Sequence, residues 1–379
     1  MSDSYTNVES VGWFSRIGNS LKGILVGMIL VVIGLGLLWF NEGRSVKRAK
    51  ALEEGRGGTV TLDSIDKVVS EMEGKLVHAV GLATGESLRD PVFPVEAKAL
   101  SLRRDVEMYQ YVESKTTREE KKAGGGVDKH VTYSYDLQWR DDWVDSKKFD
   151  TPEGHENPRM PVKGVTTSAA KVAFGAFALP NSLVGKIKGK QKISPTDEAL
   201  EAAGQYHDSP KIDDGQIYLG EDPGSPGHGD IRISFSMVPE ATVSIVSAQK
   251  GETFEPFITS NKGKLNLLAM GEKTVDEMYD KAEADNVALT WGLRAGGFVL
   301  TLIGFTLILG PLSVLADVIP LIGSIVGGVT FVVSFFMSAG LSSLVIAVSW
   351  IAFRPMVGIP LLVVTLGSFI ALIFVRKKK

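Results

Sequence analysis

The chain of 379 residues contains no cysteine. This absence excludes disulfide bridges, thiolate catalysis and zinc sites with thiolate ligands, so the fold must be stabilised by packing alone. On composition, the absence of cysteine also favours a bacterial source over a eukaryotic one.

Charge is missing from two long stretches. From Leu21 to Phe40 the only charged residue is Lys22, and from Ala295 to Val375 the only ones are Asp317 and Arg354. The overall figures, a net charge of -3 and 22% charged residues, conceal this segregation. Apolar runs of about 20 residues are typical of membrane spans. One such run is also compatible with a buried core helix, but several together predict an integral membrane protein.

We predict four transmembrane helices. Arg354 and Pro355 form a tight turn between the last two, because proline cannot continue a helix and disfavours helical geometry at the residue before it. Pro320 and the pair Gly327-Gly328 divide the long apolar tract 318–353 into a short piece and a span, although two spans there remain an alternative. The predicted spans are 21–40, 291–315, 330–353 and 356–375, with a re-entrant or interfacial segment at 316–329.

The basic residues decide the predicted orientation. The tail 376–379 is Arg-Lys-Lys-Lys, which predicts a cytoplasmic C-terminus and, with four spans, a cytoplasmic segment 1–20. Residues 41–290 then form a periplasmic or luminal domain between the first two helices. Five basic residues between Arg44 and Arg56 argue against this orientation, and a fifth span would place the two termini on opposite sides.

Two sets of residues are predicted to have roles at the membrane. Aromatic and charged side chains at the ends of the apolar runs are expected to contact the membrane edge, and Glu42 is expected to pair with Arg44 or with Arg294. Small residues four apart allow two helices to approach closely. The edge set is Trp39, Glu42, Arg44, Trp291, Arg294, Arg354 and Pro355; the helix-packing set is Gly23, Gly27, Gly292, Gly296, Gly323 and Gly327.

The region between the first two spans is predicted to be an α+β domain, mostly antiparallel and rich in β-structure. Apolar residues alternate with polar ones in 131–139 and 231–237, as in half-buried strands, and 106–112 with the glycine-rich link after it predicts a hairpin. Helices are predicted from Thr166 to Leu179, from Ser194 onward, and after the capping box of Thr274 and Glu277, where the helix runs on into the second span.

Motifs for chemistry are few. The five histidines have no metal-ligand spacing, and His155, beside Glu153 and Glu156, is interpreted as structural. The glycines 124–126 precede no Lys-Ser or Lys-Thr, and no G-x-S-x-G sequence occurs. Asp317 is interpreted as a loop acid in water. We therefore predict no catalytic residues, no cofactor, no metal and no nucleic-acid partner.

Several stretches resemble the LUMA family, also called transmembrane protein 43. In order, they are NEGRSVK with ALEEG, EGKLVHAVG, LRRDVEMYQYVE, YSYDLQWR, DSKKFDTPEGHENP, GDIRISFS, TWGLRAGGF and the Arg354-Pro355 turn. The match is loose in 160–228 and 310–340. The resemblance implies four spans and a large luminal domain, and it brings no catalytic residues. Animal members are similar proteins of the endoplasmic reticulum and inner nuclear membrane that organise complexes with emerin and lamins and self-associate.

The leading hypothesis is a non-enzymatic protein that organises membrane or envelope complexes. Its expected partners are the lipid bilayer, further copies of itself and other membrane proteins, in a bacterial inner membrane or in the eukaryotic membranes named above. The Gly- and Ser-rich tract from Gly323 to Ser349 favours an ion channel or channel-modulating subunit as the alternative. A ligand-binding or enzymatic outer domain is a weaker alternative.

Overall fold

The computed structural model describes residues 3–356, 358–360 and 363. They fall into two compact units. The domain unit comprises the described residues of 1–6, 54–116 and 131–280, and the helical unit comprises those of 7–53, 117–130 and 281–379.

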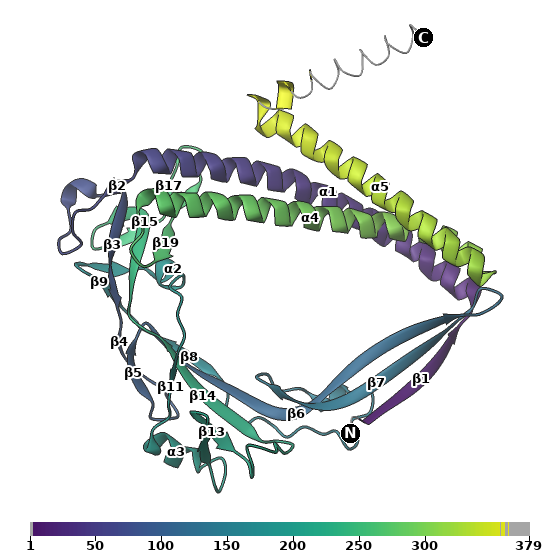
Figure 1. The fold of residues 1–379 in the computed structure, drawn as a ribbon, viewed down its shortest axis with the longest axis horizontal. Coiled ribbons are helices and arrows are strands. Elements are labelled where there is room, and N and C mark those ends of the chain that lie inside the picture. Colours follow the sequence, from purple (N-terminus) through teal and green to yellow (C-terminus); the bar gives the residue numbers. More distant parts are fainter. Residues whose placement is uncertain (1–2, 357, 361–362, 364–379) are drawn as a thin grey trace. The chain divides into compact units, whose positions relative to one another are not determined.

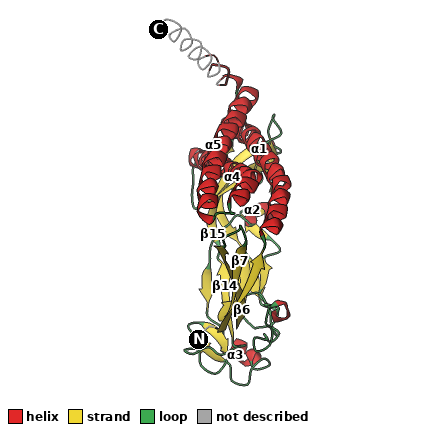
Figure 2. Ribbon diagram, turned by 90° about the vertical axis from the view of Figure 1, so that its right-hand side faces the viewer, coloured by secondary structure: helices red, strands yellow, loops and turns green. Residues whose placement is uncertain are grey.

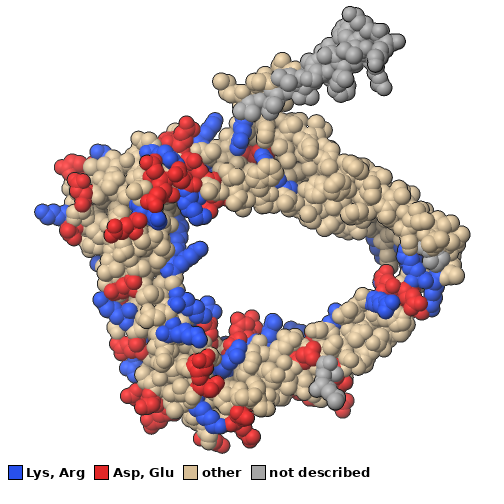
Figure 3. Space-filling model, in the orientation of Figure 1, with Lys and Arg blue, Asp and Glu red and all other residues tan. Residues whose placement is uncertain are grey.

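Three long helices dominate the helical unit: α1 (Trp13–Gly58), α4 (Val275–Ala316) and α5 (Pro320–Phe353). They lie side by side (Figure 2). All three are long and apolar enough to cross a membrane, and they are the candidate spans in the described part of the chain. Charged side chains are almost absent from their middle lengths on the face drawn in Figure 3. The predicted fourth span, 356–375, and the tail 376–379 lie largely or wholly outside the described residues.

The helices extend beyond the predicted spans. α1 continues past Phe40 because the following segment is rich in Lys, Arg, Ala and Glu, all good helix formers in water. α4 begins at the predicted capping box: Glu277 N–H donates to Thr274 Oγ1 over 3.3 Å, and Thr274 N–H donates to Glu277 Oε2 over 2.8 Å. It then runs without a break through the predicted start of the second span.

α5 differs from the predicted division of the tract 318–353. It is one continuous helix from Pro320, and Gly327 and Gly328 lie within it. In a continuous helix the main-chain N–H and C=O groups hydrogen-bond to one another, as apolar surroundings require. Glycine is tolerated inside such a helix. The structure therefore has no turn within 320–353 that would make two antiparallel spans. Whether residues 316–329 lie at the membrane interface stays a prediction.

The larger sheet has eight strands, with the order β1-β7-β6-β14-β13-β12 and with β11 paired to β14 and β8 to β6 (Figure 1). Both long strands of the predicted hairpin, β6 and β7, belong to it. The strands are β1 (Asp3–Val11), β6 (Ser101–Lys121), β7 (Val127–Arg140), β8 (Val165–Ser168), β11 (Gln191–Ile193), β12 (Lys211–Asp213), β13 (Gln216–Leu219) and β14 (Ile231–Val238).

The second sheet has seven strands in the order β19-β15-β16-β10-β9-β3-β2. Because β15 also pairs with β3, the five strands β15, β16, β10, β9 and β3 form a closed ring of neighbours. Most pairs are antiparallel; β2–β3 and β10–β16 are parallel. The strands are β2 (Val60–Thr61), β3 (Leu76–Thr84), β9 (Val172–Phe174), β10 (Phe177–Leu179), β15 (Ala241–Lys250), β16 (Thr253–Glu255) and β19 (Leu267–Met270). Two small hairpins complete the strands: β4 (Glu86–Arg89) with β5 (Glu96–Ala99), and β17 (Phe257–Ile258) with β18 (Lys264–Leu265).

Four short helical segments complete the domain unit, and two helix predictions need correction. The segments are η1 (Ser70–Met72), η2 (Ser146–Lys148), α2 (Asn181–Val184) and α3 (Asp197–Ala203). The helix predicted from Ser194 starts later, capped by Thr196, whose Oγ1 accepts from Ala199 N–H over 3.2 Å.

The prediction of a helix from Thr166 to Leu179 is wrong, because this segment forms β8, β9 and β10. Gly175 adopts φ +60 in the turn between β9 and β10, and Phe174 and Phe177 face each other across that turn. Both rings are buried in the core shared by the sheets. Burial of the aromatic residues at strand spacing overrides the alanine content that suggested a helix.

Candidate functional site

The Glu42 carboxylate lies at the centre of a polar contact between α1, α4 and α5. Glu42 is fully buried. Arg294 Nε donates to its Oε1 over 2.7 Å and Arg294 Nη2 to its Oε2 over 3.0 Å. The predicted pairing of Glu42 with Arg294 is thus confirmed. Trp350 of α5 donates from Nε1 to the same Oε2 over 3.0 Å, a contact that no sequence pattern indicates.

Aromatic rings surround this ion pair. The Arg294 guanidinium lies 4.7 Å from the ring centroid of Trp291 and 5.8 Å from that of Trp350, within cation–π range. Trp39 packs against Phe353 with a centroid distance of 5.3 Å. Trp39 and Trp291 are 40% and 63% exposed, as a membrane-facing aromatic residue requires. Their position at a membrane edge stays a prediction.

Arg44 hydrogen-bonds to neutral groups. Its guanidinium donates to Asn286 Oδ1 over 3.0 Å, to Thr290 Oγ1 over 3.0 Å and to Asn41 Oδ1 over 3.2 Å. Asn41 in turn donates from Nδ2 to the carbonyl oxygen of Thr290 over 2.9 Å. These uncharged partners were missed because single Asn and Thr residues in a sequence give no spacing signal, and only the register of α1 against α4 brings them together.

Two pairs of glycines set the close approach of α1 and α4. A Cβ placed on Gly27 would lie 2.5 Å from the carbonyl oxygen of Gly304, and one placed on Gly34 would lie 2.9 Å from that of Gly297. The partners are seven residues apart on each helix. This is the heptad spacing of antiparallel helices that pack at a small crossing angle.

The predicted glycine pairs match this contact only in part. Gly27 lies in it, and Gly23 lies beside it, where an added Cβ would be 3.8 Å from the carbonyl oxygen of Leu307. Gly292 and Gly296 have no atom of the described residues within 4 Å of such a Cβ, so they do not pack against another helix there. A search for seven-residue rather than four-residue spacing would have found the observed pairs.

Gly323 and Gly327 pack at the turn between α4 and α5. Gly323 approaches the side chain of Asp317 too closely for any Cβ, and a Cβ on Gly327 would lie 3.0 Å from Ser313 Oγ. Both glycines therefore allow α5 to fold back against the end of α4.

Asp317 is not a loop acid in water. It is 1% exposed, and its carboxylate pairs with Arg16 over 2.5 Å and with Lys121 over 2.6 Å. The sequence interpretation failed because the two cations are about 300 and 200 positions away in the chain.

Hydroxyl groups join α4 to α5 within their apolar lengths. Thr301 Oγ1 makes a short contact with Ser338 Oγ and lies 3.3 Å from Ser342 Oγ. Ser338 Oγ also donates to the carbonyl oxygen of Phe298 over 3.1 Å. Such contacts stabilise helix pairs in surroundings without water.

The predicted turn at Arg354 and Pro355 is present. α5 ends at Phe353, and Arg354 leaves the helical region with φ -133 and ψ 59 while its N–H still donates to the carbonyl oxygen of Trp350 over 2.8 Å. The residue before a proline is disfavoured in the helical region, which agrees with the end of α5 here.

In the domain unit, His155 has a structural environment. Its ring stacks on Tyr135 with a centroid distance of 4.0 Å, and its Nδ1 lies 3.1 Å from the carbonyl oxygen of Thr151. Burial raises the pKa of the Tyr135 hydroxyl, which lies 2.9 Å from Glu113 Oε2. Among the described residues, no group of three His, Asp or Glu side chains is placed to hold a metal.

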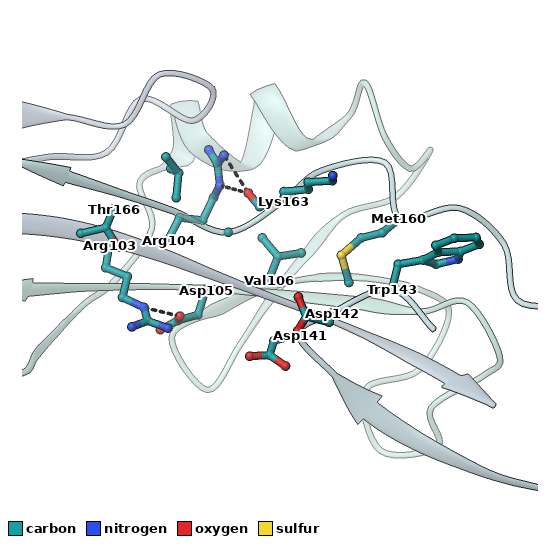
Figure 4. A pocket seen from close by; sticks show the side chains of 12 residues that line it. Arg103, Arg104, Asp105, Val106, Asp141, Asp142, Trp143, Met160, Lys163 and Thr166 are labelled. Atoms are coloured by element: carbon teal, nitrogen blue, oxygen red, sulfur yellow. Dashed lines mark hydrogen bonds and ion pairs between the residues drawn. The ribbon is translucent and has the colours of Figure 1, made fainter. Parts of the chain in front are cut away.

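The domain unit also contains a cavity of about 660 Å³ beside β6. Its polar and apolar side chains come from three separate stretches of the chain (Figure 4). Arg103 is paired with Asp105 over 2.5 Å at its rim. The cavity is lined by residues 103–106, 141–143, 160 and 163–166.

Comparisons with known proteins agree over most of the chain. Residues 108–355 match the family model described as Transmembrane protein 43. "Transmembrane protein 43" of Rattus norvegicus is 33% identical over 93% of this chain and 89% of its own length. "Transmembrane protein 43" of Homo sapiens is 33% identical over 91% of this chain and 88% of its own length. "Transmembrane protein 43 homolog" of Drosophila melanogaster is 30% identical over 91% of this chain and 93% of its own length. None of these names denotes an enzyme. No solved structure matches the chain.

Proposed function

The chain belongs to the transmembrane protein 43 family, and from this premise we propose that it is a non-enzymatic protein that organises membrane protein complexes. It is a multi-pass membrane protein, as its relatives and its apolar helices indicate. In our proposal it associates with itself and binds partners through residues 41–290, which lie on the luminal side. The proposed membrane spans are 21–40, 291–315, 330–353 and 356–375.

One observation carries the proposal: the polar and glycine contacts between α1 and α4. The buried Glu42–Arg294 pair and the close contact of Gly27 with Gly304 make this helix pair a fixed structural unit. Most large apolar side chains on α1 between Leu21 and Phe40 nevertheless stay exposed, which leaves them to lipid or to neighbouring helices. A rigid anchor of this kind suits a protein whose task is to hold others in place.

The compartment is part of the proposal. The relatives named above are animal proteins, and we place the chain in the endoplasmic reticulum and inner nuclear membrane. The bacterial inner membrane was predicted only from the missing cysteine and has no support among these relatives.

Purification and deletion test the proposal together. We expect the full-length protein in mild detergent to have the mass of an oligomer by light scattering, and we expect its deletion to change the membrane complexes resolved on native gels. A monomer, together with unchanged complexes after deletion, would overturn the proposal.

The alternative function is an ion channel or a channel-modulating subunit. The row of buried hydroxyls on α5, formed by Ser334, Ser338, Ser342 and Ser349, is the observation in its favour. Ion flux into liposomes that is lost in Gly327→Leu would establish it, since Gly327 faces Ser313 of α4. The absence of ion flux into liposomes would rule out the channel function.

A further inference from the structure

Arg44 is a charged residue of α1 whose hydrogen-bond partners are all neutral. Its guanidinium donates to side-chain oxygens of Asn41, Asn286 and Thr290 over 3.0 to 3.2 Å. Its Nε is buried and has no hydrogen-bond partner among the described residues. No carboxylate of those residues lies within 4.0 Å of its nitrogens. A cation that is partly removed from water normally has an anionic partner, so the partner of Arg44 is missing from the chain itself.

The acid nearest to Arg44 in the sequence, Glu42, already serves another cation. Both of its carboxylate oxygens accept from Arg294, and Oε2 also accepts from Trp350. The polar contact between the three helices thus contains one carboxylate and two guanidinium groups. One positive charge is left uncompensated, and it belongs to Arg44.

In the proposed membrane placement, Arg44 lies at the depth of the lipid headgroups. The exposed rings of Trp39 on α1 and Trp291 on α4 mark the edge of the apolar region. Arg44 is five residues beyond the first, and its partner Asn286 is five residues beyond the second. At 1.5 Å per residue both lie roughly 7.5 Å outside the tryptophans. The headgroup layer is about 5–8 Å thick on each side of the hydrocarbon core, so both helices bring these side chains to the level of the lipid phosphates.

The face of α1 that carries Arg44 has its groups in the order of a phospholipid. Phe40, four residues earlier, lies one turn toward the apolar length on the same face, and its side chain is 67% exposed. Lys47 and Arg48 follow Arg44 on that face, three and four residues later. An acyl chain can therefore lie along Phe40 while the phosphate of the same molecule lies beside Arg44.

We propose that Arg44 binds the phosphate group of a membrane phospholipid. The phosphate supplies the anionic partner that the chain lacks, and hydrogen bonds between a guanidinium and a phosphate are among the stronger ones in proteins. The bound lipid fixes the α1–α4 contact to the bilayer. It also gives a role to the first of the five basic residues that argue against the predicted orientation. This inference rests on the proposed function and its membrane placement, and it names a ligand for the contact between α1 and α4.

The test uses the delipidated full-length protein in a sugar detergent. The probes are phosphatidylglycerol and digalactosyldiacylglycerol with the same acyl chains, of which the second has no phosphate, and native mass spectrometry measures which lipid is retained. We expect phosphatidylglycerol to be preferred about tenfold and Arg44→Gln to abolish that preference. Lys50→Gln removes the same charge from an exposed position of α1 and should leave the preference unchanged.

Two further variants separate lipid binding from folding. Asn286→Asp places a carboxylate against Arg44, because Asn286 Oδ1 already accepts from its Nη1. This internal counter-ion should also abolish the preference, although Arg44 keeps its charge. Arg44→Lys keeps a cation at the site and should retain more of the preference than Arg44→Gln does. Inorganic phosphate, as a third probe, should not displace the lipid, since it has no acyl chain to pack along Phe40.

Each outcome has a definite meaning. If the unmodified protein shows no preference, or if the preference survives in Arg44→Gln or in Asn286→Asp, the inference is overturned. An equal loss in Lys50→Gln would show an effect of net charge alone, and displacement by inorganic phosphate would show a site for the free anion; either result also overturns it. If the preference behaves as expected but deletion leaves membrane complexes unchanged, the lipid site stands and the proposed organising function fails.

Discussion

At the scale of single residues, Glu42 depends on its partners. A carboxylate removed from water costs several kcal/mol unless opposite charge and hydrogen bonds replace the solvent. Arg294 supplies two hydrogen bonds, and Trp350 supplies a third from another helix. The ion pair therefore links three helices, and its removal affects all of them.

We predict that Glu42→Gln lowers the free energy of unfolding by roughly 3 kcal/mol, because Arg294 then keeps a largely buried charge without a counter-ion. Chemical unfolding of the purified protein in detergent measures this. Glu53→Gln, at an exposed position of the same helix, is the control. The double variant with Arg294→Gln should lose less than the sum of the single variants. If Glu42→Gln unfolds like the control, the pair does not stabilise the helices.

At the scale of elements, the α1–α4 pair depends on having no side chain at its contact points. Gly27 and Gly34 meet Gly304 and Gly297 main chain to main chain. Each glycine weakens its own helix by about 1 kcal/mol relative to alanine, and the close contact between helices offsets that weakness.

The glycines therefore divide into two classes with opposite expected effects. Gly27→Leu and Gly34→Leu should lower the melting temperature in detergent, since a large side chain would have to displace the neighbouring backbone; overpacking costs about 1–3 kcal/mol. Gly292→Leu and Gly296→Leu meet open space and should be neutral or slightly stabilising, because leucine is the better helix former. Equal effects at all four positions would contradict this assignment of the interface.

At the scale of the whole molecule, the number of membrane crossings decides which parts share a side. Three predicted spans lie between residues 41–290 and the basic tail. An odd number of crossings places the domain and the tail on opposite sides. The described part of the chain contains α4 and α5 of these three, and the third is the span predicted at 356–375.

Single-cysteine labelling tests this arrangement, and the cysteine-free chain is its own background. We expect Asp208→Cys and Lys378→Cys to react with a membrane-impermeant maleimide from opposite sides of sealed vesicles. Reaction from the same side would mean an even number of crossings between them. A third position, Ser4→Cys, decides between two arrangements. The predicted span 21–40 places segment 1–20 on the same side as Lys378, whereas the pairing of β1 with β7 requires Ser4 to share the side of Asp208, since hydrogen-bonded strands must share one side.

Local patterns predicted well wherever local chemistry decides the structure. The alternation in 131–139, the Thr274–Glu277 box and the restriction of Arg354 by Pro355 act over a few residues, and the structure has each of them. The segment from Thr166 to Leu179 was mispredicted because the strand pairing and burial that fix it involve residues far away in the chain.

The sequence by itself determined that this protein enters a membrane, that a β-rich domain interrupts its helices, and that it belongs with the LUMA family, because hydropathy, alternation and short family-like stretches are properties of contiguous residues. The tertiary structure alone decided which side chains meet. Trp350 reaches Glu42, Gly34 meets Gly297, and Asp317 pairs with Arg16 and Lys121. Each of these contacts joins residues distant in sequence, and their registers depend on the packing of whole helices and strands.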